Sequence, residues 1–437
     1  MPRLKVLQTS RDAAGSEKAE ALVIIRLPVW WTLGGLVAGL LAGIGLTNLD
    51  MAAAVVAITE PIGSLWLRAL QMTIIPLVAS LLIVGIAQLV EAASAGRVAR
   101  RMLTIMLLVL LTGGLATTVL MPLLLEVFPP PVEATGLFQT GGAETETTAL
   151  PGIGAFFQSL IAPNLFSAAA ETAMLPLAIF FALFAVAVTR LPDAQSARLL
   201  EFFRALGNAM LVIIGWVLWL APVGVFALAV GVAARAGGGA FATLLHYIVV
   251  VSAMGLVVLV AAYALAVFVG RVGLPRFSRD SLSAQAVAIS TQSSLASLPA
   301  MLASVRRMGV REDISDFVLP LAVAIFRATS PAMNLAVVYY VANISGVVIE
   351  PTAMAAGIAV ALVISVGSVS LPGTISFVVS VGPIALAMGV PVEPLALLVA
   401  VEMMPDLMRT VGNVTMDVAL AAVVDRDGGK SEGEPQL

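Results

Sequence analysis

The chain has 437 residues, of which 60% are hydrophobic and 11% charged, with a mean hydropathy of +1.05 and a formal net charge of −3. Soluble domains carry about 25% charged residues, so this composition indicates a polytopic membrane protein, and the small net charge does not suggest nucleic acid as a partner. No cysteine is present and His246 is the single histidine. Disulfides, thiolate metal sites, a cysteine nucleophile and a histidine-rich metal cluster are therefore excluded, and we expect His246 to pack rather than to do chemistry.

The predicted elements begin with a polar tail, residues 1–26, which lacks the apolar core and cleavage site of a signal peptide and is expected to be cytoplasmic. Eight apolar segments follow, each long enough to cross about 30 Å of hydrocarbon at about 1.5 Å per residue. A stretch rich in Pro, Gly and Thr, residues 129–152, is predicted to be an external loop. The eight segments are residues 27–46, 65–90, 102–125, 165–188, 209–232, 247–272, 318–344 and 395–424.

Two further apolar segments, residues 281–303 and 352–388, are each broken in the middle. The breaks read STQSSLASLP at 290–299 and GSVSLPGT at 367–374. Such serines and glycines also occur at simple helix kinks. Broken backbone at membrane depth is tolerated only where protein or a water-filled cavity covers it, so a Ser-Ser pair in one break and a Pro-Gly pair in the other favour a binding site.

The lysines and arginines predict the topology. They cluster at residues 97–101, 190–204 and 271–279 and again at 306–311, whereas residues 346–400 contain none. With a cytoplasmic N-terminus, the positive-inside rule makes the first six spans alternate, and Arg235 is the exception. The basic clusters on both sides of the first broken segment predict that it enters and returns from the cytoplasm, and the second does so from outside. The prediction is an all-α polytopic membrane protein with eight transmembrane helices, two opposed re-entrant helical hairpins and both termini cytoplasmic, in the plasma (inner) membrane.

The last apolar segment carries one polar stripe. On a continuous helix, Glu402, Asp406, Arg409, Asn413 and Asp417 fall within an arc of roughly 80°, with a threonine (position 410) at its margin. Charged groups at bilayer depth cost at least about 2.5 kcal/mol each, so they should face protein or a water-filled cavity. The stripe is either a charge-paired seam between helices or a site for a small zwitterion, with Asp406 for an ammonium and Arg409 for a carboxylate.

Two residues near this stripe are unusual. Arg327 lies 11 residues after Asp316, roughly 16 Å along a helix, which places it near mid-membrane. Pro405 directly precedes Asp406. A proline inside a helix frees the carbonyl four residues before it, so we expect Pro405 to free that of Val401 and to kink the helix.

The residues now described resemble those of the glutamate/aspartate transporters (dicarboxylate/amino acid:cation symporters) over nearly the whole chain. The likeness is most specific at Ser293-Ser294…Leu298-Pro299, Leu319-Pro-Leu…Tyr340-Val-Ala-Asn343, Leu371-Pro372-Gly373 and Asp406-x-x-Arg409-Thr410-x-x-Asn413-x-x-x-Asp417.

The resemblance implies a substrate site in which Asp406 takes the α-ammonium, Arg409 the side-chain carboxylate and Asn413 the α-carboxylate. The family's dicarboxylate branch lacks the aspartate and its neutral amino-acid branch lacks the arginine, so keeping both points to aspartate or glutamate. The tip at 371–375 resembles the gate over the substrate, and Ser330 falls where the family has a threonine. The full set of implied substrate residues is Ser293, Ser294, Ser330, Leu371, Pro372, Gly373, Asp406, Arg409, Thr410 and Asn413.

The resemblance also implies a homotrimer that works as an elevator. A scaffold of residues 27–95 and 153–235 would hold a transport domain of residues 96–128 and 236–425, which slides across the membrane with its substrate. The tails are residues 1–26 and 426–437, and residues 129–152 form the external loop.

The chain departs from the family at the expected sodium site. Where the family has Asn-Met-Asp, the seventh span reads Phe326-Arg327-Ala328, and other sodium ligands fall on Val109 and Thr112-Gly113. At roughly 6 Å and a dielectric near 20, a fixed cation opposes sodium by about 2.8 kcal/mol. Our hypothesis is that Arg327 takes the electrostatic role of the cation, which makes sodium coupling weak or absent.

A second interpretation is that Arg327 only pairs with Glu402 or Asp417, while Asn413 and Asp417, which match another family sodium site, keep a residual cation. Glu402 is a candidate proton carrier. The alternative function is a sodium- or proton-coupled symporter of acidic amino acids or C4-dicarboxylates. A channel or a substrate sensor is a further rival. We expect no enzyme activity, no cofactor and no certain metal site. The sequence does not distinguish aspartate from glutamate as the substrate, and it does not give the coupling ion, the transport direction or the resting state.

Overall fold

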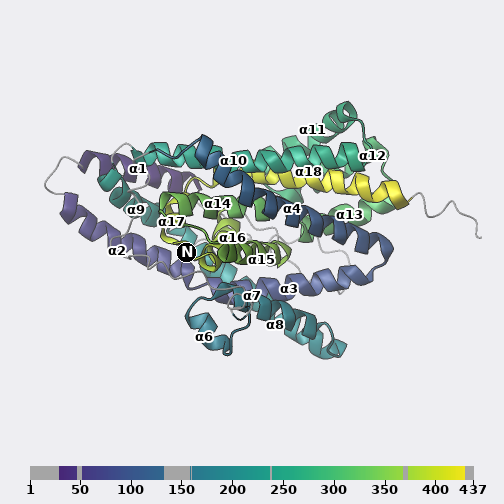
Figure 1. The fold of residues 1–437 in the computed structure, drawn as a ribbon, viewed down its shortest axis with the longest axis horizontal. Coiled ribbons are helices and arrows are strands. Elements are labelled where there is room, and N and C mark those ends of the chain that lie inside the picture. The colour runs from purple at the N-terminus through teal and green to yellow at the C-terminus, as the bar shows by residue number, and fades with distance from the viewer. Residues whose placement is uncertain are drawn as a thin grey trace, which may run out of the picture.

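The computed structural model describes residues 29–46, 52–131, 158, 160–236, 239–367 and 373–428, and within these ranges the fold is helical throughout (Figure 1). The helices are α1 Val29–Leu46, α2 Ala52–Gln71, α3 Ile74–Ser94, α4 Arg97–Val127, α6 Leu165–Ala170, α7 Met174–Val188, α8 Asp193–Trp219, α9 Ala221–Ala236, α10 Gly239–Ala264 with the π-helical turn η2 Leu265–Val269, α11 Leu274–Thr291, α12 Ser294–Met308, α13 Glu312–Ile325, α14 Ser330–Ile344, α15 Pro351–Gly367, α16 Gly373–Ala387, α17 Glu393–Leu398 and α18 Met403–Gly428.

Six helical stretches of the described chain are long and apolar enough to cross a membrane, which confirms an all-α polytopic membrane protein. They are residues 53–94, 97–127, 193–219, 239–269, 312–344 and 403–426. The other expected spans correspond to shorter apolar helices, so the count of eight stays a prediction. The fifth expected span, residues 209–232, is divided at Leu220 between α8 and α9, and α8 alone is long enough to cross.

Close backbone packing joins α1 to α9 at the left of Figure 1. Gly35, Gly39 and Gly43 recur every four residues and share one face of α1. A Cβ atom built on Gly39 would lie 2.6 Å from the Phe226 carbonyl oxygen and 2.8 Å from the Ala229 Cβ. Only glycine permits this approach, and α2, which also packs on α9, completes a three-helix unit at this end.

A second group of helices consists of α10, α11, α12, α13 and α18. The helix α18 lies beside α10 and contacts α11, α12 and α13 (Figure 1). The helices α11 and α12 pack against each other and turn at Gln292, whose φ of 50° is left-handed, followed by the N-cap residue Ser293. The helices α15 and α16 also pack together. Their connection, residues 368–372, lies outside the described residues.

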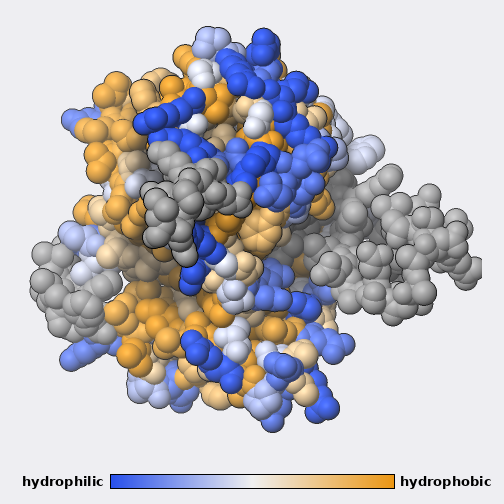
Figure 2. All heavy atoms as spheres, turned by 90° about the vertical axis from the view of Figure 1, so that its right-hand side faces the viewer, coloured by the Kyte–Doolittle hydropathy of each residue, from blue (hydrophilic) through white to orange (hydrophobic). Residues whose placement is uncertain are grey.

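Polar residues gather where α11, α12, α13 and the end of α18 meet. Figure 2 looks onto this end and shows hydrophilic side chains collected there, with hydrophobic side chains on the flanks. Arg311 pairs with Asp425 at 2.8 Å, and Arg307 donates to the Asp280 carbonyl at 2.9 Å. The basic clusters on both sides of the first broken segment therefore lie at one end of the molecule.

Candidate functional site

A cluster of buried charges lies beside α10, where two interruptions of helix meet the first turns of α18. The interruptions are the non-helical residues between α13 and α14 (326–329), of which Phe326 is extended and 328–329 form a turn, and the turn between α17 and α18 (399–402). The side chains of Glu402, Asp406, Arg409, Asn413 and Asp417 are all buried. The polar stripe predicted from the sequence thus faces protein, as the cost of charge in hydrocarbon requires.

The Arg409 guanidinium is fully engaged within the protein. One terminal nitrogen donates to Glu402 Oε1 at 2.9 Å and the other to Asn334 Oδ1 at 2.7 Å, while Nε lies 3.5 Å from Asp406 Oδ1. The second oxygen of Glu402 accepts a hydrogen bond from the Tyr247 hydroxyl at 2.7 Å. Glu402 and Asn334 therefore hold the two terminal nitrogens that a bidentate substrate carboxylate would need.

The expectation about Pro405 is wrong. The helix α18 begins at Met403, so Pro405 is its third residue, where the absent N–H has no partner to lose. The Val401 carbonyl is not freed, because it accepts from the Met404 N–H at 3.0 Å. Glu402 lies in the turn before the helix rather than on the helical stripe, and its carbonyl accepts from the Asp406 N–H at 2.9 Å.

The Asn413 amide is oriented by Thr329 of the α13–α14 break. Its Oδ1 accepts from both the backbone N–H and the hydroxyl of Thr329, each at 2.9 Å. Because the oxygen faces the break, the NH₂ group is directed away from Thr329. Thr329 also fills the space above Gly412, where an added Cβ would lie 2.6 Å from its methyl group.

Arg327 lies in the same break, near mid-span as expected but outside any helix. The charged groups whose field acts on it are Asp406, Arg409 and Asp417. Neither carboxylate oxygen of Asp417 has a hydrogen-bond partner among the described residues. The field of Asp406 acts on Arg327 more strongly than that of Asp417, while Arg327 is the charged group whose field acts on Asp417; Glu402 pairs with Arg409.

Of the remaining predicted residues, two bond to the cluster and the others lie at the two predicted hairpin tips. Ser330 joins it, since its hydroxyl accepts from Asn334 Nδ2 at 3.0 Å, and the Thr410 hydroxyl donates to the Asp406 carbonyl at 3.0 Å. Ser293 makes local bonds at the α11–α12 turn, where its hydroxyl accepts from the Ala296 N–H at 3.2 Å, and Ser294 opens α12. Leu371 and Pro372 lie outside the described residues, and Gly373 begins α16.

The helix α4 packs on the break at the positions that correspond to sodium ligands in the resemblance. The nearest atoms to a Cβ on Gly113 would be the Ala332 Cβ at 3.7 Å and the Ala328 carbonyl at 3.9 Å. The Thr112 hydroxyl is exposed and donates to the Leu108 carbonyl of its own helix at 2.7 Å. It is therefore not directed at the break.

Sequence reasoning missed Asn334, Tyr247 and Thr329. Asn334 follows Ser330 by one helical turn in an otherwise apolar run, and that spacing is the one signal that could have found it. Tyr247 and Thr329 carry no such signal, because their partners come from distant parts of the chain.

Comparisons with known proteins cover nearly the whole chain. The model of the sodium:dicarboxylate symporter family matches residues 29–427. The proton/sodium-glutamate symport protein of Bacillus subtilis is 27% identical over 377 residues, which are 84% of this chain and 85% of the relative. The proton/glutamate-aspartate symporter of Escherichia coli is 28% identical over 385 residues, 85% of each chain. The human neutral amino acid transporter B(0) is 28% identical over 458 residues, 94% of this chain and 82% of the relative.

Proposed function

The chain belongs to the sodium:dicarboxylate symporter family, and we propose that it carries the acidic amino acids aspartate and glutamate across the membrane with weak or no dependence on sodium. Its family and relatives make it a multi-pass membrane transporter of amino acids or dicarboxylates rather than an enzyme. The observation that carries the finer proposal is the buried pair of Asp406 and Arg409, 3.5 Å apart, beside the oriented Asn413 amide.

Each charge of the substrate has a counterpart in this cluster. Asp406 takes the α-ammonium, and the Arg409 fork takes the side-chain carboxylate as a bidentate pair. The NH₂ group of Asn413 donates to the α-carboxylate, with help from Ser294, and Ser293, Ser330 and Thr410 complete the proposed set of substrate residues. The tip at Leu371, Pro372 and Gly373 closes over the bound molecule.

Glu402 competes with the substrate for Arg409. Its carboxylate forms a 2.9 Å ion pair with that guanidinium, so the substrate carboxylate must displace it. A proton on Glu402 removes the competing charge, while Tyr247 continues to hold the side chain. We therefore assign Glu402 as the proton carrier of the cycle.

Arg327 is proposed to replace the coupling cation. It brings a permanent positive charge into the field of Asp406 and Asp417, at the position where the family resemblance places sodium ligands. Asn413 Oδ1 already accepts two hydrogen bonds from Thr329, which further disfavours it as a side-chain ligand of a residual cation with Asp417. No cofactor is proposed.

The architecture we propose has eight spans, two opposed re-entrant hairpins, cytoplasmic termini and a homotrimeric assembly. The packing of α11 on α12 and of α15 on α16 supports the hairpins, and midplane sites at broken helices are typical of inverted-repeat transporters. The three-helix unit of α1, α2 and α9 belongs to the proposed scaffold, and α10 to α18 belong to the moving domain.

A C4-dicarboxylate carrier is the second candidate. Asp406 lies in the field of two guanidinium groups, Arg409 and Arg327, and these compete with a substrate ammonium for its charge. The variant Asp406→Ala separates the candidates, because it should abolish aspartate transport but leave succinate transport intact in a dicarboxylate carrier.

The direct test is uptake of radiolabelled aspartate into proteoliposomes, with sodium, potassium and proton gradients varied one at a time. We expect saturable uptake that responds to the proton gradient and persists when choline replaces sodium. Loss of aspartate binding in choline, measured by calorimetric titration, would reject the proposed role of Arg327.

A further inference from the structure

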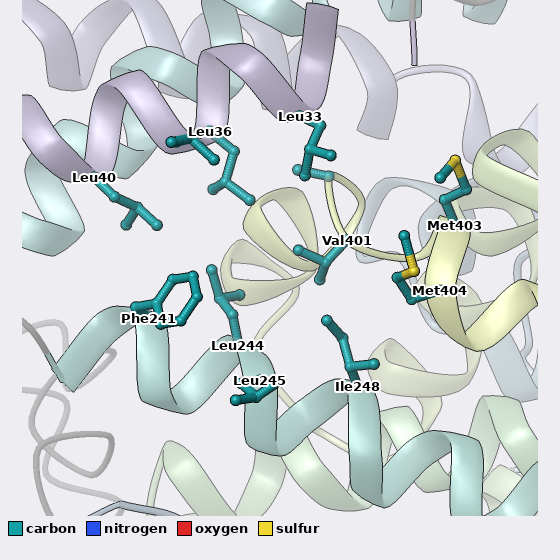
Figure 3. A pocket seen from close by; sticks show the side chains of 12 residues that line it. Leu33, Leu36, Leu40, Phe241, Leu244, Leu245, Ile248, Val401, Met403 and Met404 are labelled. Atoms are coloured by element: carbon teal, nitrogen blue, oxygen red, sulfur yellow. The ribbon is translucent and has the colours of Figure 1, made fainter. Parts of the chain in front are cut away.

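An apolar cavity of about 190 Å³ lies between α1, α10 and the turn that precedes α18 (Figure 3). Figure 3 shows leucines of α1 on one side of this space, α10 side chains on the other, and Val401 and Met404 between them. All of its lining side chains are hydrocarbon or thioether. They include Leu36, Leu40, Leu244, Ile248, Val401 and Met404.

The chemistry of the wall determines the kind of occupant. Water needs two to four polar partners, and this wall offers none from its side chains. A purely apolar cavity of about 150 Å³ in another protein stays dry and takes up benzene. Atoms that line an unfilled space also lose dispersion contacts. The occupant of this cavity is therefore apolar.

The cavity opens onto an exposed apolar face of α10. Phe241 and Leu245 line it and are 61% and 54% exposed, whereas Leu36 and Leu244 of the same wall are 2% and 4% exposed. A path of apolar side chains thus leads from the outer face of α10 to a buried inner wall. The helix α10 belongs to a candidate membrane span, so acyl chains are the apolar partner that a membrane would bring to this face, and the cavity would continue that contact inward.

We propose that this cavity binds one acyl chain of a bilayer phospholipid, and that the bound chain holds the turn of residues 399–402 in position. Val401 and Met403 line the cavity and flank Glu402. The partner of Glu402, Tyr247, lies on α10 between the lining residues Leu245 and Ile248. A chain in the cavity therefore supports both elements that position the carboxylate on Arg409.

Lipid binding itself does not depend on the proposed function, whereas its effect on transport does. The test uses a phosphatidylethanolamine that carries a diazirine near the end of one acyl chain. The full-length protein is reconstituted in vesicles with this lipid and illuminated, and the adducts are mapped by peptide mass spectrometry. We expect adducts on buried residues of the inner wall, namely Leu36, Leu244 or Val401.

Variants that fill the cavity provide the decisive comparison. Ala400→Leu and, independently, Leu244→Phe should remove the inner-wall adducts and leave those on the exposed Phe268 unchanged. The control Val260→Phe alters an exposed side chain of the same helix and should change neither. Adducts confined to exposed side chains, or inner-wall adducts that survive in both monodisperse filling variants, would overturn the proposal.

Two further comparisons distinguish a phospholipid from a free fatty acid, and failure of this proposal from failure of the proposed function. A free fatty acid with the same diazirine should label the inner wall less than the phospholipid does, and the reverse order would overturn the phospholipid assignment. Inner-wall adducts without aspartate uptake would refute the proposed function alone. Aspartate uptake without inner-wall adducts would refute the acyl-chain site alone.

Discussion

Replacement of Glu402 by glutamine tests how the empty site is held. The change removes one negative charge but keeps a side chain of nearly the same shape that can still bond to Tyr247 and Arg409. At present Glu402 lies 2.9 Å from the Arg409 guanidinium and 2.7 Å from the Tyr247 hydroxyl. The fold should therefore survive, while the competition for Arg409 should weaken.

The structure sets the size of the effect. Two unit charges about 4 Å apart attract by about 4 kcal/mol at an effective dielectric of 20. The substrate carboxylate recovers most of that attraction when it takes the place of Glu402, so only part of it opposes binding. If one third remains, about 1.4 kcal/mol, the variant Glu402→Gln should bind aspartate about tenfold more tightly than the native chain at neutral pH.

The pH dependence gives an independent readout of the same idea. The groups that face Glu402 are Tyr247 on α10 and Arg409 and Asp406 on α18. Protonation of Glu402 frees Arg409, so native affinity should rise as pH falls, whereas the affinity of Glu402→Gln should be high and nearly flat with pH. Calorimetric titration with aspartate at several pH values measures both.

A matched control is Glu312→Gln, which removes a carboxylate from an exposed ion pair with Arg306 at 3.6 Å. Exposed pairs contribute about 0–1 kcal/mol, so neither affinity nor its pH profile should change. The reasoning is refuted if Glu402→Gln binds aspartate more weakly and keeps the native pH profile. That result would make Glu402 a support of the fold rather than a competitor of the substrate.

Three further changes have definite expected outcomes. Thr329→Val removes the hydroxyl that bonds to Asn413 and should weaken aspartate binding about tenfold in calorimetry, the size of one hydrogen bond. The double variant Arg327→Met with Ala328→Asp should make aspartate binding in choline weaker than in sodium; equal binding in the two salts contradicts it. Gly39→Leu forces α1 from α9 and should lower the thermal unfolding midpoint by several degrees, whereas Gly45→Leu, with open space around it, should not.

The sequence was sufficient for those features that depend on composition and local period. Hydropathy alone indicates an all-helical membrane chain, and the 3.6-residue period places Asp406, Arg409, Asn413 and Asp417 on one face of α18, a helix that is buried almost all round. The serine-rich break of the first interrupted segment also coincides with the turn between α11 and α12.

The sequence was insufficient where local structure is set by distant contacts. Residues 326–329 lie in an apolar run, so hydropathy predicts a continuous helix, but the backbone there leaves the helix and bonds to Asn413 through Thr329. Pro405 was interpreted as an interruption because the helix start two residues earlier has no strong sequence signal. The sequence therefore predicts Glu402 on the helical stripe. No local pattern points to its partner Tyr247, which is 155 positions away.

The charges of the cluster connect the missing sodium site to the proton. Three carboxylates, Glu402, Asp406 and Asp417, face two guanidiniums, Arg327 and Arg409, so the fully ionised empty cluster has a formal charge of −1. Aspartate or glutamate adds a further −1, and one proton on Glu402 restores the original value. Since uncompensated buried charge is costly, loaded and empty carriers are matched only if one proton accompanies each substrate. In the proposed cycle Glu402 releases Arg409 on protonation and supplies that proton where the substrate binds, so that no bound sodium ion is required to balance the charge.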